Sequence, residues 1–169
     1  MLRDATVHDS ANICEIYNHY ILSSVVTFEE KAVTPSEMLA RINKIRERFP
    51  WIVFEHENEI LGYAYATEWK SRAAYKHTAE TTVYLDSAAT RQGIGSRLYQ
   101  SLLERLELLG FHVAIAGIAL PNEASVGLHE RFGFTKVAQF GQVGRKFDRW
   151  IDVGYWELRL PRPAKLKEH

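Results

Sequence analysis

The sequence predicts a single α/β (α+β) domain in which a mixed β-sheet is flanked by helices. Strand-like segments rich in β-branched and aromatic residues alternate with segments of helical periodicity, in the order strand, helix, helix, three strands, helix, strand, helix, two strands. The 169 residues, 46% of them hydrophobic, suffice for one well-packed core. No Gly-, Ser- or Pro-rich linker interrupts the chain, so we expect one domain over residues 1–161 and a tail over 162–169.

The first third of the chain predicts a short strand over residues 2–5 and two helices. Asp9 or Ser10 can cap the first helix, whose apolar residues recur every three or four positions: Ile13, Ile16, Tyr17, Tyr20 and Ile21. The second helix has a stronger start signal. Thr34 suits the N-cap, Pro35 the first helical position and Glu37 the acidic position of a capping box.

The middle of the chain predicts a β-hairpin, a third strand and a long helix. Residues 51–55 and 60–69 form the two hairpin strands around a polar turn at 56–59. The third strand, 79–85, runs into a glycine-containing turn at 91–96. The leucine-rich helix that follows is ended by Gly110.

The last third predicts a strand over 113–118, a short helix and two closing strands near 135–143 and 151–160. Asn122 can cap the short helix, which reaches about Arg131 and is ended by Gly133.

Charge and cysteine content exclude several classes of partner. Lys plus Arg and Asp plus Glu both total 21, so no global field attracts nucleic acid or an anionic membrane surface. No run approaches the roughly 20 apolar residues of a membrane span. Cys14 is the single cysteine and is expected to be a small buried hydrophobe, which favours a reducing, cytoplasmic location. We expect no metal.

The glycine turn is the first candidate binding element. Gly93 and Gly95 allow several backbone N–H groups to approach one anion at a helix N-terminus, and Arg91 adds a charged contact. A phosphate or pyrophosphate is the natural ligand. The spacing matches neither the Walker lysine motif nor the dinucleotide fingerprint. Taken alone, the glycines could equally serve tight packing at a strand-to-helix turn.

Several segments carry a family resemblance. The strand Val83-Tyr84-Leu85, the turn Gln92-Gly93-Ile94-Gly95 and the following helix resemble the acetyl-CoA motif of the GNAT superfamily of N-acetyltransferases. The remaining segments resemble its phosphinothricin acetyltransferase group, which includes methionine sulfoximine and methionine sulfone acetyltransferases: Arg72-x-x-Tyr75, His77-x-x-Glu80, Leu120-Pro121-Asn122, Leu128-His129-Glu130, Gly133-Phe134, Gly144-Arg145-Lys146 and Trp150-x-Asp152. The resemblance implies a splayed, mostly antiparallel sheet.

The resemblance also implies how acetyl-CoA is held. The backbone of Val83, Tyr84 and Leu85 pairs with the pantetheine arm like an added strand. The turn at Arg91 and the amides from Gln92 through Gly93, Ile94, Gly95 and Ser96 hold the pyrophosphate, and Asn122 contacts the cofactor. Thr90 departs from the superfamily pattern, which usually has Gln or Arg three positions before the first glycine.

Glu80 is the candidate general base. An α-amine with a pKa of about 8 is mostly protonated at neutral pH, so its attack on a thioester needs a proton acceptor. Strand alternation places Glu80, Thr82 and Tyr84 on one face of the sheet. From the residues alone, Glu80 could instead lie on a solvated sheet face, and the base role is what the resemblance implies.

The remaining roles also follow from the resemblance. A backbone N–H near Val83 or Leu85 is the expected oxyanion donor. His129 is either the general acid that protonates the leaving thiolate or a surface helix residue. The expected substrate-binding residues lie in two loops, with Lys146 to Trp150 completing the pocket wall: Phe28, Glu29, Arg72, Ala73, Ala74 and Tyr75.

These features predict an enzyme, an acetyl-CoA-dependent N-acetyltransferase that acts on the α-amine of phosphinothricin, methionine sulfoximine, methionine sulfone or a related amino acid. Such a reaction would serve detoxification of an antibiotic or herbicide, or metabolism. A non-catalytic acetyl-CoA sensor and an acetyltransferase for polyamines or protein N-termini are the alternatives. The C-terminal aromatic residues Trp150, Tyr155 and Trp156 are compatible with the homodimer that this group forms.

Overall fold

A computed structural model describes residues 1–161 of the chain and confirms the predicted order of elements. The tail expected over residues 162–169 lies outside the described residues. The strands are β1 (Leu2–Asp4), β2 (Trp51–His56), β3 (Glu59–Glu68), β4 (Thr78–Leu85), β5 (Val113–Leu120), β6 (Thr135–Lys146) and β7 (Arg149–Arg159). The helices are α1 (Ser10–Ser23), α2 (Pro35–Arg46), α3 (Ile94–Leu108) and α4 (Glu123–Arg131).

The strands form one sheet in the order β1-β2-β3-β4-β5-β7-β6. Every neighbouring pair is antiparallel except β4 and β5, which run parallel. The prediction of a mixed, mostly antiparallel sheet is therefore confirmed.

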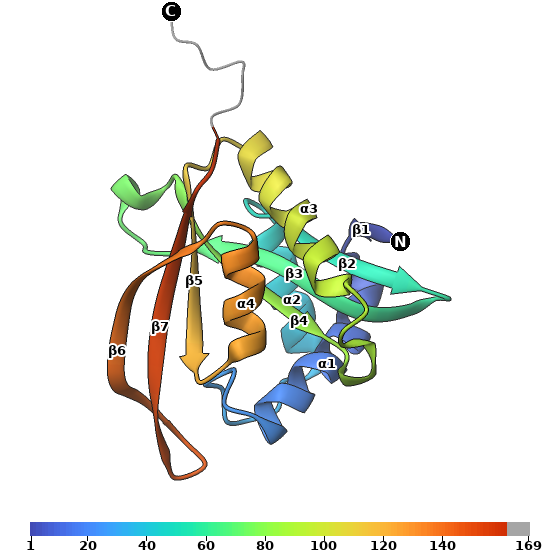
Figure 1. Ribbon diagram of the computed structural model, residues 1–169. Coiled ribbons are helices and arrows are strands. Elements are labelled where there is room, and N and C mark those ends of the chain that lie inside the picture. Colours follow the sequence, from blue (N-terminus) through green and yellow to red (C-terminus); the bar gives the residue numbers. More distant parts are fainter. Residues whose placement is uncertain (162–169) are drawn as a thin grey trace, which may run out of the picture.

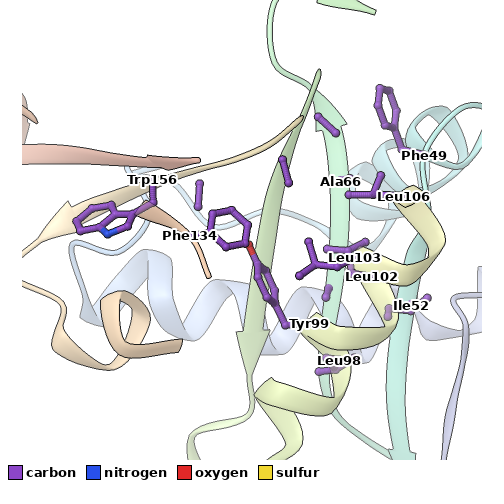
Figure 2. Close-up of a cluster of buried hydrophobic side chains, with 14 of the residues drawn as sticks. Phe49, Ile52, Ala66, Leu98, Tyr99, Leu102, Leu103, Leu106, Phe134 and Trp156 are labelled. Atoms are coloured by element: carbon purple, nitrogen blue, oxygen red, sulfur yellow. The ribbon is translucent and has the colours of Figure 1, made fainter. Parts of the chain in front are cut away.

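Helices cover both faces of the sheet (Figure 1). Strand alternation divides β2 between two cores, because Trp51 and Val53 pack with α1 and α2 whereas Ile52 and Phe54 pack with α3. Figure 2 shows the second core, in which leucines of α3 meet aromatic residues from the C-terminal half of the chain: Leu98, Tyr99, Leu102, Leu103, Leu106, Phe134 and Trp156.

The start of α2 follows its sequence signal, but the start of α1 does not. Thr34 and Glu37 form the capping box, with Pro35 in the first turn. At α1, Asp9 occupies the N-cap position but makes no side-chain cap bond, because its carboxylate binds the Arg3 guanidinium instead. Ser10 donates to the Val7 carbonyl and is itself the first helical residue.

Two hairpins are tighter than expected. His56 and Glu59 pair across the first one, so the turn consists of Glu57 and Asn58, both with positive φ as in a type I′ turn. The last two strands extend to Lys146 and Arg149. The segment expected to wall the pocket, Lys146 to Trp150, therefore forms the tip of the β6–β7 hairpin.

The parallel pair β4–β5 separates after only three paired positions, the last of which joins Glu80 to Ile115. Beyond this point β4 stays paired with β3 as far as Leu85, and β5 stays paired with β7 as far as Leu120. The two strands diverge visibly in Figure 1. The divergence leaves adjoining backbone edges of β4 and β5 open to a ligand in the middle of the sheet.

Candidate active site

A pocket of about 480 Å³ lies over the point where β4 and β5 diverge. Glu80, Thr82 and Tyr84 of β4 form one side of it, which confirms the predicted alternation along this strand. The opposite side comes from β5, β6, β7 and the loop after α1: Val26, Thr27, Phe28, Gly117, Ala119, Phe140, Val143, Val153 and Tyr155. The Glu80 carboxylate is the one charged group among these lining residues, and most of the others are apolar.

Glu80 is partly buried at the last paired position of β4 and β5. Burial raises the pKa of its carboxyl, and the charge of Lys70 lowers it in part. A carboxylate whose pKa is raised toward neutrality is a better proton acceptor than an ordinary glutamate. The structure therefore places Glu80 in a pocket, where it is only partly exposed.

Thr81 fixes the divergence from the other face of β4. Its hydroxyl donates to the Ile115 carbonyl of β5 at 3.2 Å, at the position where the backbone ladder ends. The Tyr99 hydroxyl of α3 lies 2.6 Å from the same Thr81 oxygen. Burial raises the pKa of Tyr99, so the phenol stays protonated and donates. This buried chain holds β4, β5 and α3 together directly behind Glu80.

The loop after α1 is bound to the far end of the sheet by two contacts. Phe28 packs against Gly144 of β6, where a Cβ would overlap its ring. Lys146 is buried, and its ammonium group donates to the Thr27 carbonyl at 2.8 Å. Thr27 in turn lies 2.8 Å from the Tyr17 hydroxyl of α1. These contacts position Phe28 as one wall of the pocket.

Glu29, the neighbour of Phe28, is not part of the pocket lining. Its carboxylate binds the Arg41 guanidinium of α2 through both oxygens, at 2.6 and 3.2 Å. Arg41 therefore already binds the Glu29 carboxylate, which was expected to contact the substrate.

The glycine turn has the geometry that anion binding requires. Gly93 is the N-cap of α3 with φ 75°, a left-handed conformation that favours glycine, and a Cβ there would meet no atom within 4 Å. The N–H groups of Ile94, Gly95 and Ser96 belong to the first turn of α3 and have no carbonyl partner within the helix. Arg91 also has positive φ and is exposed. The start of α3 therefore combines open space with backbone N–H groups that have no partner within the helix.

Asn122 stands at the matching position of the next strand-to-helix turn, after β5. Its side-chain oxygen accepts from the Ser125 N–H at 3.1 Å and so caps α4 as predicted. The amide nitrogen of Asn122 is left free by this bond to contact a ligand.

Arg72, Ala73, Ala74 and Tyr75 lie in the connection between β3 and β4, where the last three form a short 3-10 turn. Arg72 is exposed, and Tyr75 packs edge-on against Trp69 with ring centres 5.2 Å apart. None of the four borders the pocket that contains Glu80. The structure therefore does not bring this group and Phe28 together around one cavity.

His129 is buried at 4% exposure, so the alternative of a surface helix residue is wrong. Its ring packs between Tyr99 and Phe134, and its Nδ1 lies 2.7 Å from the Ser125 carbonyl, which can only accept. Burial lowers the pKa of His129, so the neutral ring donates from Nδ1 and carries a lone pair on Nε2. Among the described residues, no group hydrogen-bonds that Nε2.

Sequence reasoning missed most of the distal pocket wall, which comes from β5, β6 and β7. Phe140 and Val143 belong to β6 and Val153 and Tyr155 to β7. One available signal was Gly117, an isolated glycine within the apolar strand Val113–Leu120, because such a glycine often marks a close approach of another group.

Comparisons with known proteins identify the family. A family model described as the acetyltransferase (GNAT) domain matches residues 2–154. The chain belongs to the GNAT family of acetyltransferases. The expected family, fold class and enzyme class are thereby confirmed, and this GNAT protein is an acyltransferase.

Three relatives show the subgroup. This GNAT protein is 42% identical to the phosphinothricin N-acetyltransferase of Streptomyces viridochromogenes over 97% of its chain and 91% of the relative. It is 35% identical to the L-methionine sulfoximine/L-methionine sulfone acetyltransferase of Salmonella typhimurium over 96% of each. The crystal structure of a phosphinothricin acetyltransferase from Sinorhizobium meliloti in complex with acetyl-CoA has a TM-score of 0.94 and 33% identity, covering 100% of this chain and 92% of that chain.

Two further features are absent from residues 1–161. No group of three or more His, Cys, Asp or Glu residues in this range could hold a metal ion. No helix in the same range is long and apolar enough to cross a membrane.

Proposed function

We propose that this protein transfers the acetyl group of acetyl-CoA to the α-amine of a small amino acid of the phosphinothricin, methionine sulfoximine or methionine sulfone type, with Glu80 as the general base. The observation that carries the proposal is the partly buried carboxylate of Glu80, with its raised pKa, at the point where β4 and β5 separate. The names of the two similar enzymes above support the substrate class.

The chemistry requires one proton acceptor and one oxyanion donor. The neutral amine attacks the thioester carbonyl, a C–N bond forms, and Glu80 takes the amine proton directly or through water. The negative oxygen of the tetrahedral intermediate accepts from a backbone N–H of the open β4 edge near Val83 or Leu85. The C–S bond then breaks, and the CoA thiolate leaves and takes up a proton.

The leaving thiolate needs a proton donor. His129 is our candidate acid from the resemblance. The Ser125 carbonyl nevertheless favours the tautomer in which Nε2 accepts rather than donates. An acid role for His129 therefore requires prior protonation of a buried ring whose pKa is lowered.

Acetyl-CoA fits the open elements of the site. In our proposal the Val83, Tyr84 and Leu85 backbone pairs with the pantetheine arm, and Asn122 contacts it from the α4 side. The amides of Gln92 to Ser96 hold the pyrophosphate together with Arg91. The open space above Gly93 and the unpaired first turn of α3 support this placement.

The cofactor placement has a matched test. Gly93 and Gly110 both have strongly positive φ, 75° and 82°, and a Cβ at either would meet no atom within 4 Å. Gly93→Val and Gly110→Val therefore carry similar backbone strain. We expect only Gly93→Val to weaken acetyl-CoA binding, by at least about tenfold in calorimetry. Equal affinities in the two variants would contradict the placement.

The substrate side chain should lie against the apolar wall that includes Phe28. Arg72 with Tyr75 is our candidate for the α-carboxylate from the resemblance, although neither residue borders the pocket that contains Glu80. Ala73 and Ala74 belong to the same proposed segment. Glu29 is a weaker candidate, because Arg41 already binds its carboxylate. Arg72→Ala should raise the KM for the amino acid and leave the acetyl-CoA affinity unchanged.

A thiol-release assay tests the function itself. The purified protein is given acetyl-CoA with phosphinothricin, methionine sulfoximine, methionine sulfone, common amino acids or polyamines. Turnover confined to amino acids supports the proposal. Turnover with polyamines instead would favour the alternative of an acetyltransferase for polyamines or protein N-termini, and acetyl-CoA binding without any turnover would indicate a sensor.

We further propose a cytoplasmic homodimer that acts in detoxification. Large apolar residues of the β6–β7 hairpin are more than half exposed and support a contact with a second copy: Val137, Phe140, Val143, Phe147 and Trp150. The buried free thiol of Cys14 supports a reducing compartment. Trp150→Asp should shift the molecular mass in light scattering from dimer to monomer.

A further inference from the structure

Gly117 is the one glycine in the floor of the pocket, and it faces Glu80 from the neighbouring strand. It lies in the middle of β5, directly opposite Tyr155 in the β5–β7 register. Gly117 is exposed, whereas Ala116 and Ile118 on either side of it are buried. Its open face therefore belongs to the pocket.

The space above Gly117 is narrow. A Cβ at this position would lie 3.4 Å from Oε1 of Glu80, 3.2 Å from Cε1 of Tyr155 and 3.6 Å from Cζ of the same ring. The gap between carboxylate and ring thus holds about one non-hydrogen atom. A nitrogen that donates to Oε1 must come within about 2.9 Å of it, so an amine that approaches Oε1 from the Gly117 side lies in this gap.

The Tyr155 ring is held in place on the other side of the gap. Phe140 of β6 packs edge-on against it, with ring centres 5.8 Å apart. Burial and the charge of Glu80 raise the pKa of Tyr155, so the phenol stays neutral at the pH at which Glu80 acts as a base. The ring therefore forms a fixed, uncharged wall facing the carboxylate.

We infer that Gly117 and Tyr155 form the amine position of the active site and make the enzyme select primary amines over N-alkylated ones. This inference rests on the proposed function. It assigns a binding position to the nitrogen of the substrate and not to its side chain. Gly117 leaves room for the nitrogen beside Glu80. Tyr155 limits that room, because an extra carbon on the nitrogen would meet the ring edge.

The alternative is a purely structural role, in which Gly117 only permits close packing between β5 and the Tyr155 ring. In that case an added methyl group would destabilise the fold without a specific effect on the amine. The first hypothesis predicts a loss of amine turnover and the second a loss of fold stability. Kinetics and stability therefore have to be measured on the same variants.

Gly117→Ala fills the gap. We expect kcat/KM for the amino acid to fall at least about 100-fold, with acetyl-CoA affinity close to that of the parent. The thermal unfolding midpoint should fall only slightly, because the added Cβ would lie 3.2 Å from the Tyr155 ring, which has to shift by a few tenths of an ångström. Gly127→Ala is the matched control, because Gly127 is exposed on α4 and a Cβ there would meet nothing within 4 Å. A Gly117→Ala enzyme as active as Gly127→Ala would overturn the inference.

Tyr155 variants test the selectivity and do not depend on the tolerance of β5 for a methyl group. Methionine sulfone and its N-methyl derivative are compared as substrates of the parent, Tyr155→Phe and Tyr155→Ala. The parent and Tyr155→Phe should acetylate only the primary amine, because both keep the ring. Tyr155→Ala should raise the ratio of N-methyl to primary turnover at least about tenfold, since the wall is gone.

The outcomes separate the inference from the function on which it rests. An unchanged ratio in Tyr155→Ala, or equal use of both amines by the parent, would overturn the amine position while leaving the acetyltransferase intact. A parent enzyme that acetylates no amine at all would contradict the proposed function itself.

Discussion

Two carboxylates of this protein show how the same group serves structure in one region and chemistry in another. Asp9, before α1, is 5% exposed and binds Arg3 through both oxygens at 2.7 and 2.8 Å. Burial alone would raise the pKa of Asp9, but the bonds from Arg3 and Thr6 outweigh it and lower that pKa. Glu80 is also partly buried, but no ion pair within the described residues includes it, and its pKa is raised.

The difference lies in what each carboxylate can still accept. The Thr6 N–H and hydroxyl occupy Oδ2 of Asp9 in addition to Arg3, so its charge is stabilised and unavailable to a substrate. The Glu80 carboxylate instead borders the narrow space above Gly117 and has no cation bound to it among residues 1–161. A buried carboxylate without a partner is costly to keep charged, and that cost is what makes it a base.

The largest expected effect is on Glu80. Glu80→Gln should reduce turnover at neutral pH by at least about 100-fold, which corresponds to about 2.7 kcal/mol of lost transition-state stabilisation. Steady-state kinetics at saturating acetyl-CoA measure it. Glu68→Gln is the control, because it replaces an exposed glutamate on the neighbouring β3, and it should keep full activity. Parental turnover in Glu80→Gln would remove this residue from the mechanism.

Asp9→Asn should lower the stability of the fold and leave the activity unchanged. The change leaves Arg3 without its bidentate partner, and we expect about 2 kcal/mol less stability in urea unfolding at pH 7. Activity per folded molecule should not change, since Asp9 lies outside the pocket. Asp4→Asn removes a more exposed carboxylate from Arg105 and should cost less than 1 kcal/mol. A loss of turnover in Asp9→Asn would break the division between the two regions.

The pH dependence of stability should differ in sign between the two sites. Because the folded pKa of Glu80 is raised, its charge destabilises the fold above that pKa, and Glu80→Gln should melt at a higher temperature than the parent at pH 7. The gain should vanish below the ordinary pKa of glutamate. Asp9, with a lowered pKa, stabilises the fold above its ordinary pKa and loses this effect as pH falls. Calorimetric scans of the parent, Glu80→Gln and Asp9→Asn from pH 7 to pH 3 measure both effects. Changes of the same sign in the two variants would contradict the prediction.

The smallest effect is expected at Glu29 and Arg41, an ion pair whose side chains are 37% and 42% exposed. Solvent screens such a pair, so Arg41→Gln should change the free energy of unfolding by less than 1 kcal/mol. Urea unfolding measures it. A change as large as that of Asp9→Asn would show that partnering, and not burial, decides how much a carboxylate contributes.

Local signals predicted the elements well. The Thr34–Glu37 capping box, the leucine spacing of α3 and the Asn122 cap each act within one turn of helix, and all three are present in the structure. At Asp9 the same local reasoning gave the correct N-cap position but not the side-chain bond, because this carboxylate has an alternative partner. Arg3 reaches it from β1, and no rule about helix ends contains that contact.

The sequence by itself determined the order of elements, the face on which Glu80 lies and the glycine turn before α3, because alternation and capping depend on neighbouring residues. Only the tertiary structure decided that the Glu80 carboxylate faces Gly117 and Tyr155, that Phe28 closes the pocket and that His129 is buried. These residues lie far apart in the chain. They meet because sheet register and the divergence of β4 from β5 arise from pairing between distant strands, which no local pattern encodes.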